Sequence, residues 1–82
     1  MSAEDIVAAL VKRRVSKATA VQYADAFAEY REASDNIGKH GAIVKHPRTG
    51  NPIRNPYLAV RDGALDKLRK MQNRGLDVDF LW

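Results

Sequence analysis

The feature that most constrains the fold of this chain is a helical repeat of apolar residues between positions 17 and 37. Apolar side chains recur there every three or four residues, the spacing that places them on one face of an α-helix. They form an alanine-rich row and a neighbouring aromatic row, made of Val21, Ala24 and Ala28 and of Tyr23, Phe27 and Tyr30. Ser16 can cap the start of this helix, and Gly38 or Gly41 can end it. The sequence therefore predicts one long helix whose wide apolar stripe is either an ordinary core face or a face shared between subunits.

A second long helix is predicted from about residue 56 to residue 74. Asn55 and Pro56 are a strong start signal, because asparagine caps a helix and proline at the first helical position loses no hydrogen bond. Gly75 follows at the position that favours a left-handed backbone. Between the two helices, residues 42–54 combine a β-prone run with turn residues, which predicts a small β-hairpin with Arg48 at its tip.

These elements predict a mainly α fold. Residues 1–15 should form a short N-terminal helix that starts at a capping box made by Ser2 and Asp5. Residues 16–75 should form a long antiparallel helical hairpin with the β-hairpin inserted at about 42–54. Residues 76–82 form an acidic and aromatic C-terminal tail.

The small size of the chain favours association with other subunits. An 82-residue fold buries little surface and usually needs disulfides, a metal or partner subunits. The chain has no cysteine, and His40 and His46 have no carboxylate at ligand spacing, so we predict neither disulfide nor metal site. The apolar side chains on both flanks of the long helix should stay partly exposed in a single chain. We therefore predict a homo-oligomer.

Charge and motifs narrow the function further. Residues 39–74 carry nine Lys or Arg against two acidic residues, Asp62 and Asp66. This balance fits either contact with a polyanion such as nucleic acid or a surface kept soluble by charge. No apolar run is long enough to cross a membrane and the first residues do not resemble a signal peptide, so we expect a cytosolic protein. No nucleophile–base arrangement or phosphate-binding loop is visible, so we predict neither an enzyme nor a cofactor.

An ordered series of short motifs points to a family. Gly41-Ala42-Ile43-Val44-Lys45 is followed, after a short turn, by Asn55-Pro56-Tyr57-Leu58-Ala59-Val60. A long helix containing residues 23–33 precedes the series, and residues 67–71 lead into Gly75-Leu76. In this order the motifs resemble the small terminase subunits of tailed phages.

The resemblance implies a non-catalytic ring in the DNA-packaging motor of a phage or virus-like particle. Such a ring delivers DNA in the bacterial cytoplasm to the large terminase, which supplies the ATPase and nuclease, and regulates it. Family members commonly carry a helix-turn-helix region before the long helix, and only about 15 residues precede it here, too few for that module. The resemblance therefore implies a reduced form, as in gene transfer agents or satellite elements, with weak or non-specific binding to double-stranded DNA.

Three groups of candidate site residues follow from this hypothesis. Candidates for weak phosphate contact, whose alternative role is solubility and ion pairing between subunits, are Lys45, Arg48, Arg54 and Arg61. The tail residues, which either dock on the large terminase or pack on their own ring, are Phe80, Leu81 and Trp82. The candidate oligomer interface comprises Tyr23, Phe27, Tyr30, Leu58, Leu65 and Leu68.

One alternative function belongs to a different class of protein. The first two helices and the cations near them could serve a small helical DNA-binding transcriptional regulator, using Lys12, Arg13, Arg14 and Lys17. Such a regulator should be a monomer or a dimer, whereas a small terminase should contain many subunits.

Overall fold

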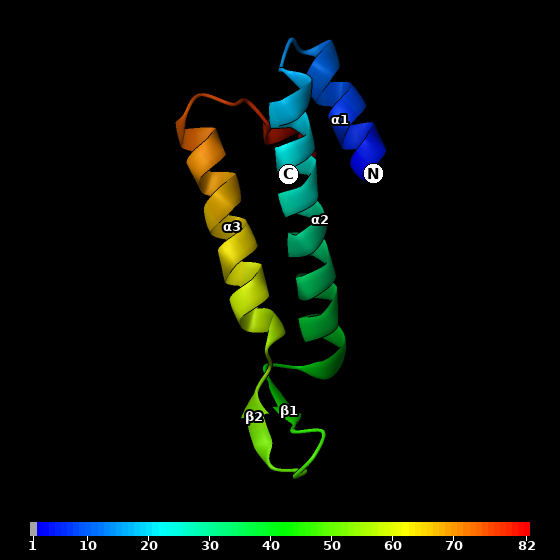
Figure 1. Cartoon of the computed structure of the whole chain (residues 1–82), viewed down its shortest axis with the longest axis vertical. Coiled ribbons are helices and arrows are strands. Elements are labelled where there is room, and N and C mark those ends of the chain that lie inside the picture. Colours follow the sequence, from blue (N-terminus) through cyan, green and yellow to red (C-terminus); the bar gives the residue numbers. More distant parts are fainter. Residues whose placement is uncertain (1) are drawn as a thin grey trace.

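The computed structural model describes residues 2–82, which form an elongated molecule of 50 × 23 × 19 Å. Within that range the chain forms three α-helices and one two-stranded sheet: α1 (Ala3–Lys12), α2 (Lys17–His40), β1 (Ile43–Lys45), β2 (Pro52–Arg54) and α3 (Tyr57–Asn73). Helices α2 and α3 lie side by side and antiparallel, and the β-hairpin extends beyond them at one end (Figure 1). The predicted mainly α fold, with a long helical hairpin and a small β-hairpin, is confirmed.

Helix α1 starts and ends with local hydrogen bonds. The Asp5 N–H donates to the Ser2 hydroxyl at 3.2 Å, and the Ser2 N–H donates to the Asp5 carboxylate at 3.1 Å, so the predicted capping box is present. The backbone bond from Ser2 favours the ionised carboxylate and thereby lowers the pKa of Asp5 from its ordinary value. At the other end Arg14 adopts a φ of 69°, and the Val15 N–H donates to the Leu10 carbonyl at 3.0 Å. Arginine thus occupies a left-handed position that glycine usually fills.

Glycines end the two longer helices. Helix α2 passes through Gly38 and ends before Gly41, whose φ is 84°. Gly75, with a φ of 100°, follows α3, and its N–H donates to the Gln72 carbonyl at 3.0 Å. The Leu76 N–H reaches back to the Met71 carbonyl at 3.4 Å, which completes a Schellman motif. This turn sends the chain back across α2, where Asp79–Leu81 form a 3₁₀ helix.

The core lies where α1, the first half of α2, the end of α3 and the tail meet. Its buried residues are Ile6, Leu10, Ala20, Tyr23, Ala24, Ala26, Phe27, Leu68 and Val78. The expectation that apolar side chains on both flanks of the long helix stay partly exposed in one chain holds for Val21 and Tyr30. It is wrong for Tyr23 and Phe27, which lie in the core that α1 and the tail complete. Closer to the β-hairpin the molecule consists of α2 and α3 alone, and the buried apolar residues outside the main cluster are Ala33, Leu58 and Ala64.

Candidate functional site

The end of the molecule that carries the β-hairpin contains no acidic residue. Residues 36–61 include no Asp or Glu and five Lys or Arg. This stretch runs from the last turns of α2, through β1 and β2, into the first turns of α3, so its positive charge collects at one end of the long axis (Figure 1). Positive charge concentrated in this way creates a local potential that attracts polyanions.

The strand register places two of the predicted DNA contacts on one face of the hairpin. Ile43 pairs with Arg54, Val44 with Ile53, and Lys45 with Pro52. Because neighbouring side chains on a strand point to opposite faces, Lys45 and Arg54 lie on the same face as Ile43. These three residues are exposed, whereas Val44 and Ile53 on the opposite face are half-buried.

Hydrogen bonds inside the turn fix the position of Arg48. The Nδ1 atom of His46 accepts hydrogen bonds from the backbone N–H groups of Arg48 at 3.1 Å and Thr49 at 3.4 Å. The Gly50 N–H donates to the His46 carbonyl at 2.8 Å, and Gly50 itself has a φ of 71°. The turn is therefore held by the side chain and the carbonyl group of His46, and Arg48 stands exposed within it.

Asn55 fastens the base of the hairpin to both long helices. It is the one buried polar residue among those described, with 2% of its surface exposed. Its Nδ2 donates to the Gly41 carbonyl at 2.8 Å and to Asn36 Oδ1 at 3.0 Å, while its Oδ1 accepts from the Tyr57 N–H at 3.0 Å. The side chain thus caps α3 as predicted and also ties α3 to the end of α2. Sequence reasoning identified the cap but missed the partnership with Asn36, which lies 19 residues away.

Arg61 differs from the cations of the hairpin. It lies on α3, and its guanidinium is paired with the carboxylate of Asp62 at 3.3 Å. The structure therefore brings Lys45, Arg48 and Arg54 together on the hairpin and leaves Arg61 beside an acidic neighbour.

The cations assigned to the alternative regulator lie at the opposite end, around the α1–α2 turn (Figure 1), where Arg13 stacks at 3.9 Å over the ring of Phe80.

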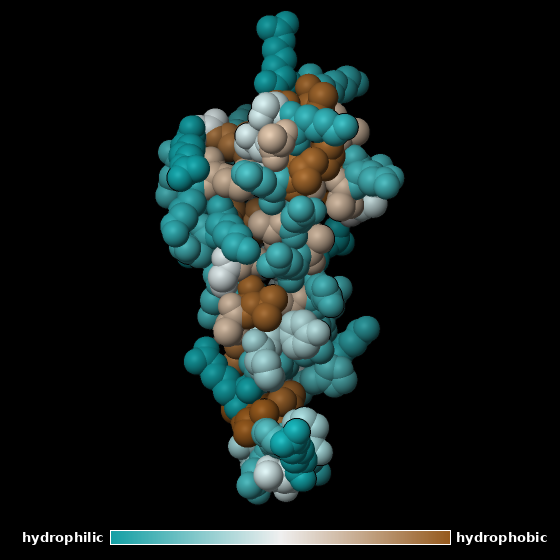
Figure 2. Space-filling model, viewed as in Figure 1, coloured by the Kyte–Doolittle hydropathy of each residue, from teal (hydrophilic) through white to brown (hydrophobic). Residues whose placement is uncertain are grey.

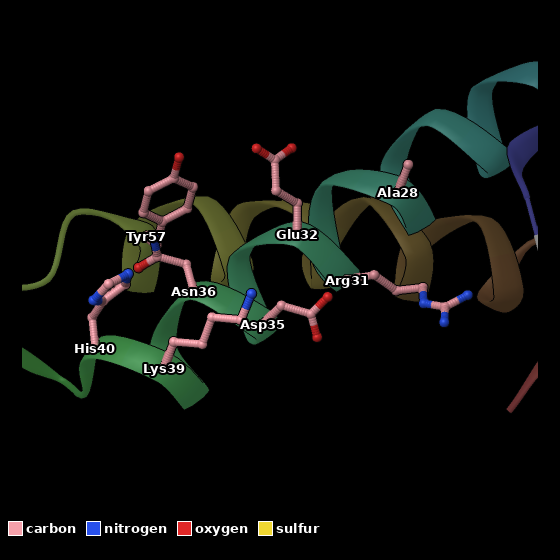
Figure 3. Close-up of a pocket in the computed structure, with 8 residues that line it drawn as sticks. All are labelled: Ala28, Arg31, Glu32, Asp35, Asn36, Lys39, His40 and Tyr57. Carbon is pink, nitrogen blue, oxygen red and sulfur yellow. The ribbon is translucent and has the colours of Figure 1, made fainter.

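A shallow groove runs along α2 toward the base of the hairpin. Figure 3 shows its lining, in which α2 supplies every residue except Tyr57: Ala28, Arg31, Glu32, Asp35, Asn36, Lys39, His40 and Tyr57. Acidic and basic side chains are mixed, so the groove presents no field of a single sign. A second hollow shares Asn36, His40 and Tyr57 with it and reaches the exposed Ile43.

The tail packs on its own chain. The Nε1 atom of Trp82 donates to the Tyr23 hydroxyl at 3.0 Å, and the indole meets the rings of Phe27 and Tyr30 edge-on at 5.2 and 5.4 Å. Trp82 nevertheless remains 55% exposed, and Phe80 is exposed as well. The aromatic end of the chain is thus attached to the α2–α3 pair and still presents apolar surface.

The residues predicted for the oligomer interface divide into two groups. Tyr23, Phe27, Leu58 and Leu68 are buried within the chain, so their burial requires no neighbouring subunit. Tyr30 and Leu65 are half-buried. The exposed apolar residues Val11, Val21, Ile43 and Val60 were not among the six interface candidates, although Val21 belongs to the predicted apolar stripe. Figure 2 shows apolar patches on one face of the molecule, separated by hydrophilic side chains.

The described residues include neither a cluster of metal ligands nor a membrane-spanning helix. Among residues 2–82, no three His, Asp or Glu side chains gather closely enough to hold a metal ion. No helix in the same range combines the length and the apolarity that a bilayer crossing requires.

Comparison with known proteins identifies the family. No curated protein and no solved structure matches the chain. The sequence profile of the family described as "Phage terminase, small subunit" matches residues 4–76, which include α2, the β-hairpin, α3 and all of α1 except its first residue. The resemblance inferred from the motifs is therefore confirmed over most of the chain. This protein belongs to the phage terminase small subunit family and has a role in DNA packaging.

Proposed function

We propose that the protein is the non-catalytic ring of a DNA-packaging motor, which holds double-stranded DNA, delivers it to the large terminase and regulates that enzyme in the bacterial cytoplasm. The observation that carries the proposal is the acid-free, basic β-hairpin at one end of a helical core in a chain of this family. The family match supports a packaging role over the transcriptional regulator.

The hairpin cations would contact the DNA backbone. Lys45, Arg48 and Arg54 are exposed and close together in the fold, and none has an acidic residue within its own segment. Arg61 would contribute less, because Asp62 already neutralises it. Contacts to phosphate alone carry no sequence information, so binding should be weak, non-specific and sensitive to salt.

Assembly would join neighbouring helical hairpins head to tail into a closed ring. The half of the molecule near the β-hairpin supports this proposal, because it is only two helices thick and has few buried apolar residues. Val21, Val60, Tyr30 and Leu65 offer apolar surface to a neighbour. The buried residues Tyr23, Phe27, Leu58 and Leu68 would support such an interface from beneath.

The tail would supply the contact with the large terminase. Phe80, Leu81 and Trp82 keep apolar surface accessible, and exposed aromatic residues often dominate interface energetics. Val78 is buried in the core, so deleting the whole tail would also damage the fold. The variant Phe80→Ala should therefore be compared with Val11→Ala, which shortens an exposed apolar residue elsewhere. Equal retention of the large terminase by both variants in a pull-down would reject the tail contact.

DNA binding is the direct test of the hairpin. Fluorescence anisotropy with a labelled duplex should show affinity that falls steeply as NaCl rises. Arg48→Glu should weaken binding and reduce the slope of log K against log salt by about one for each contacting subunit. The matched control is Lys17→Glu, a charge reversal at the other end of the molecule. Loss of binding in Lys17→Glu but not in Arg48→Glu would favour the regulator and contradict the hairpin assignment.

A further inference from the structure

The most exposed large apolar residue of the chain lies in the middle of its basic end. Ile43 has 63% of its surface exposed, more than any other large apolar residue described. Its cross-strand partner is Arg54, and Lys45 follows two residues later on the same face. Phosphate contact explains the two cations but not an isoleucine between them.

This face of the hairpin is free to meet another molecule. The half-buried pair Val44 and Ile53 occupies the opposite face, and the sheet has only two strands, so each strand has an unpaired edge. The hairpin also projects beyond the ends of α2 and α3 (Figure 1). The face carrying Ile43, Lys45 and Arg54 is therefore presented at the tip of a narrow ribbon.

The ribbon is held in a defined position. Asn55 ties its base to α2 and α3 through three hydrogen bonds, and the Asn55 N–H donates to the Ala42 carbonyl at 2.8 Å. At the other end His46 Nδ1 holds the turn. A surface fixed in this way loses little conformational entropy when it binds.

From this arrangement we infer that the β-hairpin enters the major groove of duplex DNA, with Ile43 against base edges and Lys45 and Arg54 on the phosphates beside the groove. The inference rests on the proposed DNA binding and specifies its mode. The major groove admits a two-stranded β-ribbon, whereas the minor groove is about half as wide. An apolar side chain in the major groove meets the 5-methyl group of thymine, which is its one apolar feature.

A second copy of the hairpin is less suited than duplex DNA to bind the face that carries Ile43, Lys45 and Arg54. Pairing between copies would bring Lys45 and Arg54 of one chain against the same cations of the next, and like charges across strands are destabilising. A polyanion neutralises these charges instead. Charge complementarity therefore selects DNA over another copy of the chain.

Two alternating duplexes test the inference: one of dA and dT, and one in which dU replaces dT and so lacks the methyl group. The wild-type protein should bind the thymine duplex about fourfold more tightly for each contact, the effect expected from burying one methyl group. Ile43→Ala should lose this preference and keep its salt dependence, because both cations remain. Val11→Ala is the control, since it shortens another exposed apolar residue, on α1. With the wild-type protein, the major-groove ligand methyl green should displace DNA binding, and the minor-groove ligand netropsin should not.

The other possible results show whether groove entry or the proposed DNA binding itself is wrong. Salt-sensitive binding with equal affinity for the two duplexes, or displacement by netropsin alone, would overturn groove entry and leave the proposed phosphate binding intact. No binding to either duplex at low salt would overturn both proposals. If Ile43→Ala changes the subunit number of the assembly rather than the thymine preference, the face belongs to a second copy and the inference is wrong.

Discussion

Replacement of Asn55 by alanine should destabilise the protein more than any other single loss of a polar side chain at the hairpin end. Asn55 is buried, and its amide makes three hydrogen bonds that join α2, α3 and the hairpin. Alanine cannot replace any of them. The Gly41 carbonyl loses a donor, and the first turn of α3 loses its cap.

The size of the effect follows from these contacts. Loss of a helix cap costs about 1 kcal/mol. The bonds to Gly41 and Asn36 add about 1–2 kcal/mol together, at the lower end of the usual range because Gly41 is exposed and water can replace part of the loss. A total of about 2–3 kcal/mol corresponds to a fall in Tm of about 10–20 °C for a domain of this size.

Circular dichroism melting at matched subunit concentration measures this change, because assembly makes Tm depend on concentration. Asn73→Ala is the control: Asn73 is an exposed asparagine in the last turn of α3. Its Tm should stay close to that of the wild type. If Asn55→Ala also melts within a few degrees of the wild type, the three hydrogen bonds do not fasten the hairpin and the reasoning is refuted.

Three further predictions concern other parts of the fold. Arg14→Gly should raise the free energy of unfolding by about 1 kcal/mol, because φ is 69° there and glycine adopts it without strain; an unchanged urea midpoint would contradict this. Tyr23→Phe removes the hydroxyl that accepts hydrogen bonds from Trp82 and Gln72, so the tail should detach more easily from α2. The fluorescence of Trp82, the single tryptophan, should then move to longer wavelength, and an unchanged spectrum would count against the docked tail. The lowered pKa of Asp5 stabilises the protein above the ordinary aspartate range, and this contribution should disappear as the pH falls through that lowered pKa. The protection of the α1 amides from exchange, taken relative to the intrinsic rate at each pH, should fall with it, and Asp5→Ala should remove this pH dependence.

The helices and the hairpin could be predicted because their signals are local. The three- and four-residue spacing around Tyr23 and Phe27, together with the Asn55-Pro56 start, defined α2 and α3 to within a few residues. The choice between Gly38 and Gly41 could not be made from the sequence, since either glycine can end a helix. The structure selects Gly41, which has the positive φ and lies where Asn55 can reach its carbonyl.

What the sequence could not provide depends on contacts between distant segments. Trp82 meets Tyr23 across 59 residues, and no local pattern predicts that the tail returns to α2. For the same reason the burial of Leu68 within one chain could not be foreseen, because it depends on α3 packing against α2 and on the tail returning to this part of the core. At the candidate site, residue type identified the cations, whereas the shared face of Lys45, Arg54 and Ile43 depends on the strand register.

Native mass spectrometry of the purified chain tests the proposed assembly most directly. A ring of helical hairpins predicts one dominant species that contains many subunits at micromolar concentration. Well-folded single copies under those conditions would contradict the account, because the helical pair near the β-hairpin would then be stable without sister chains to cover its apolar surface.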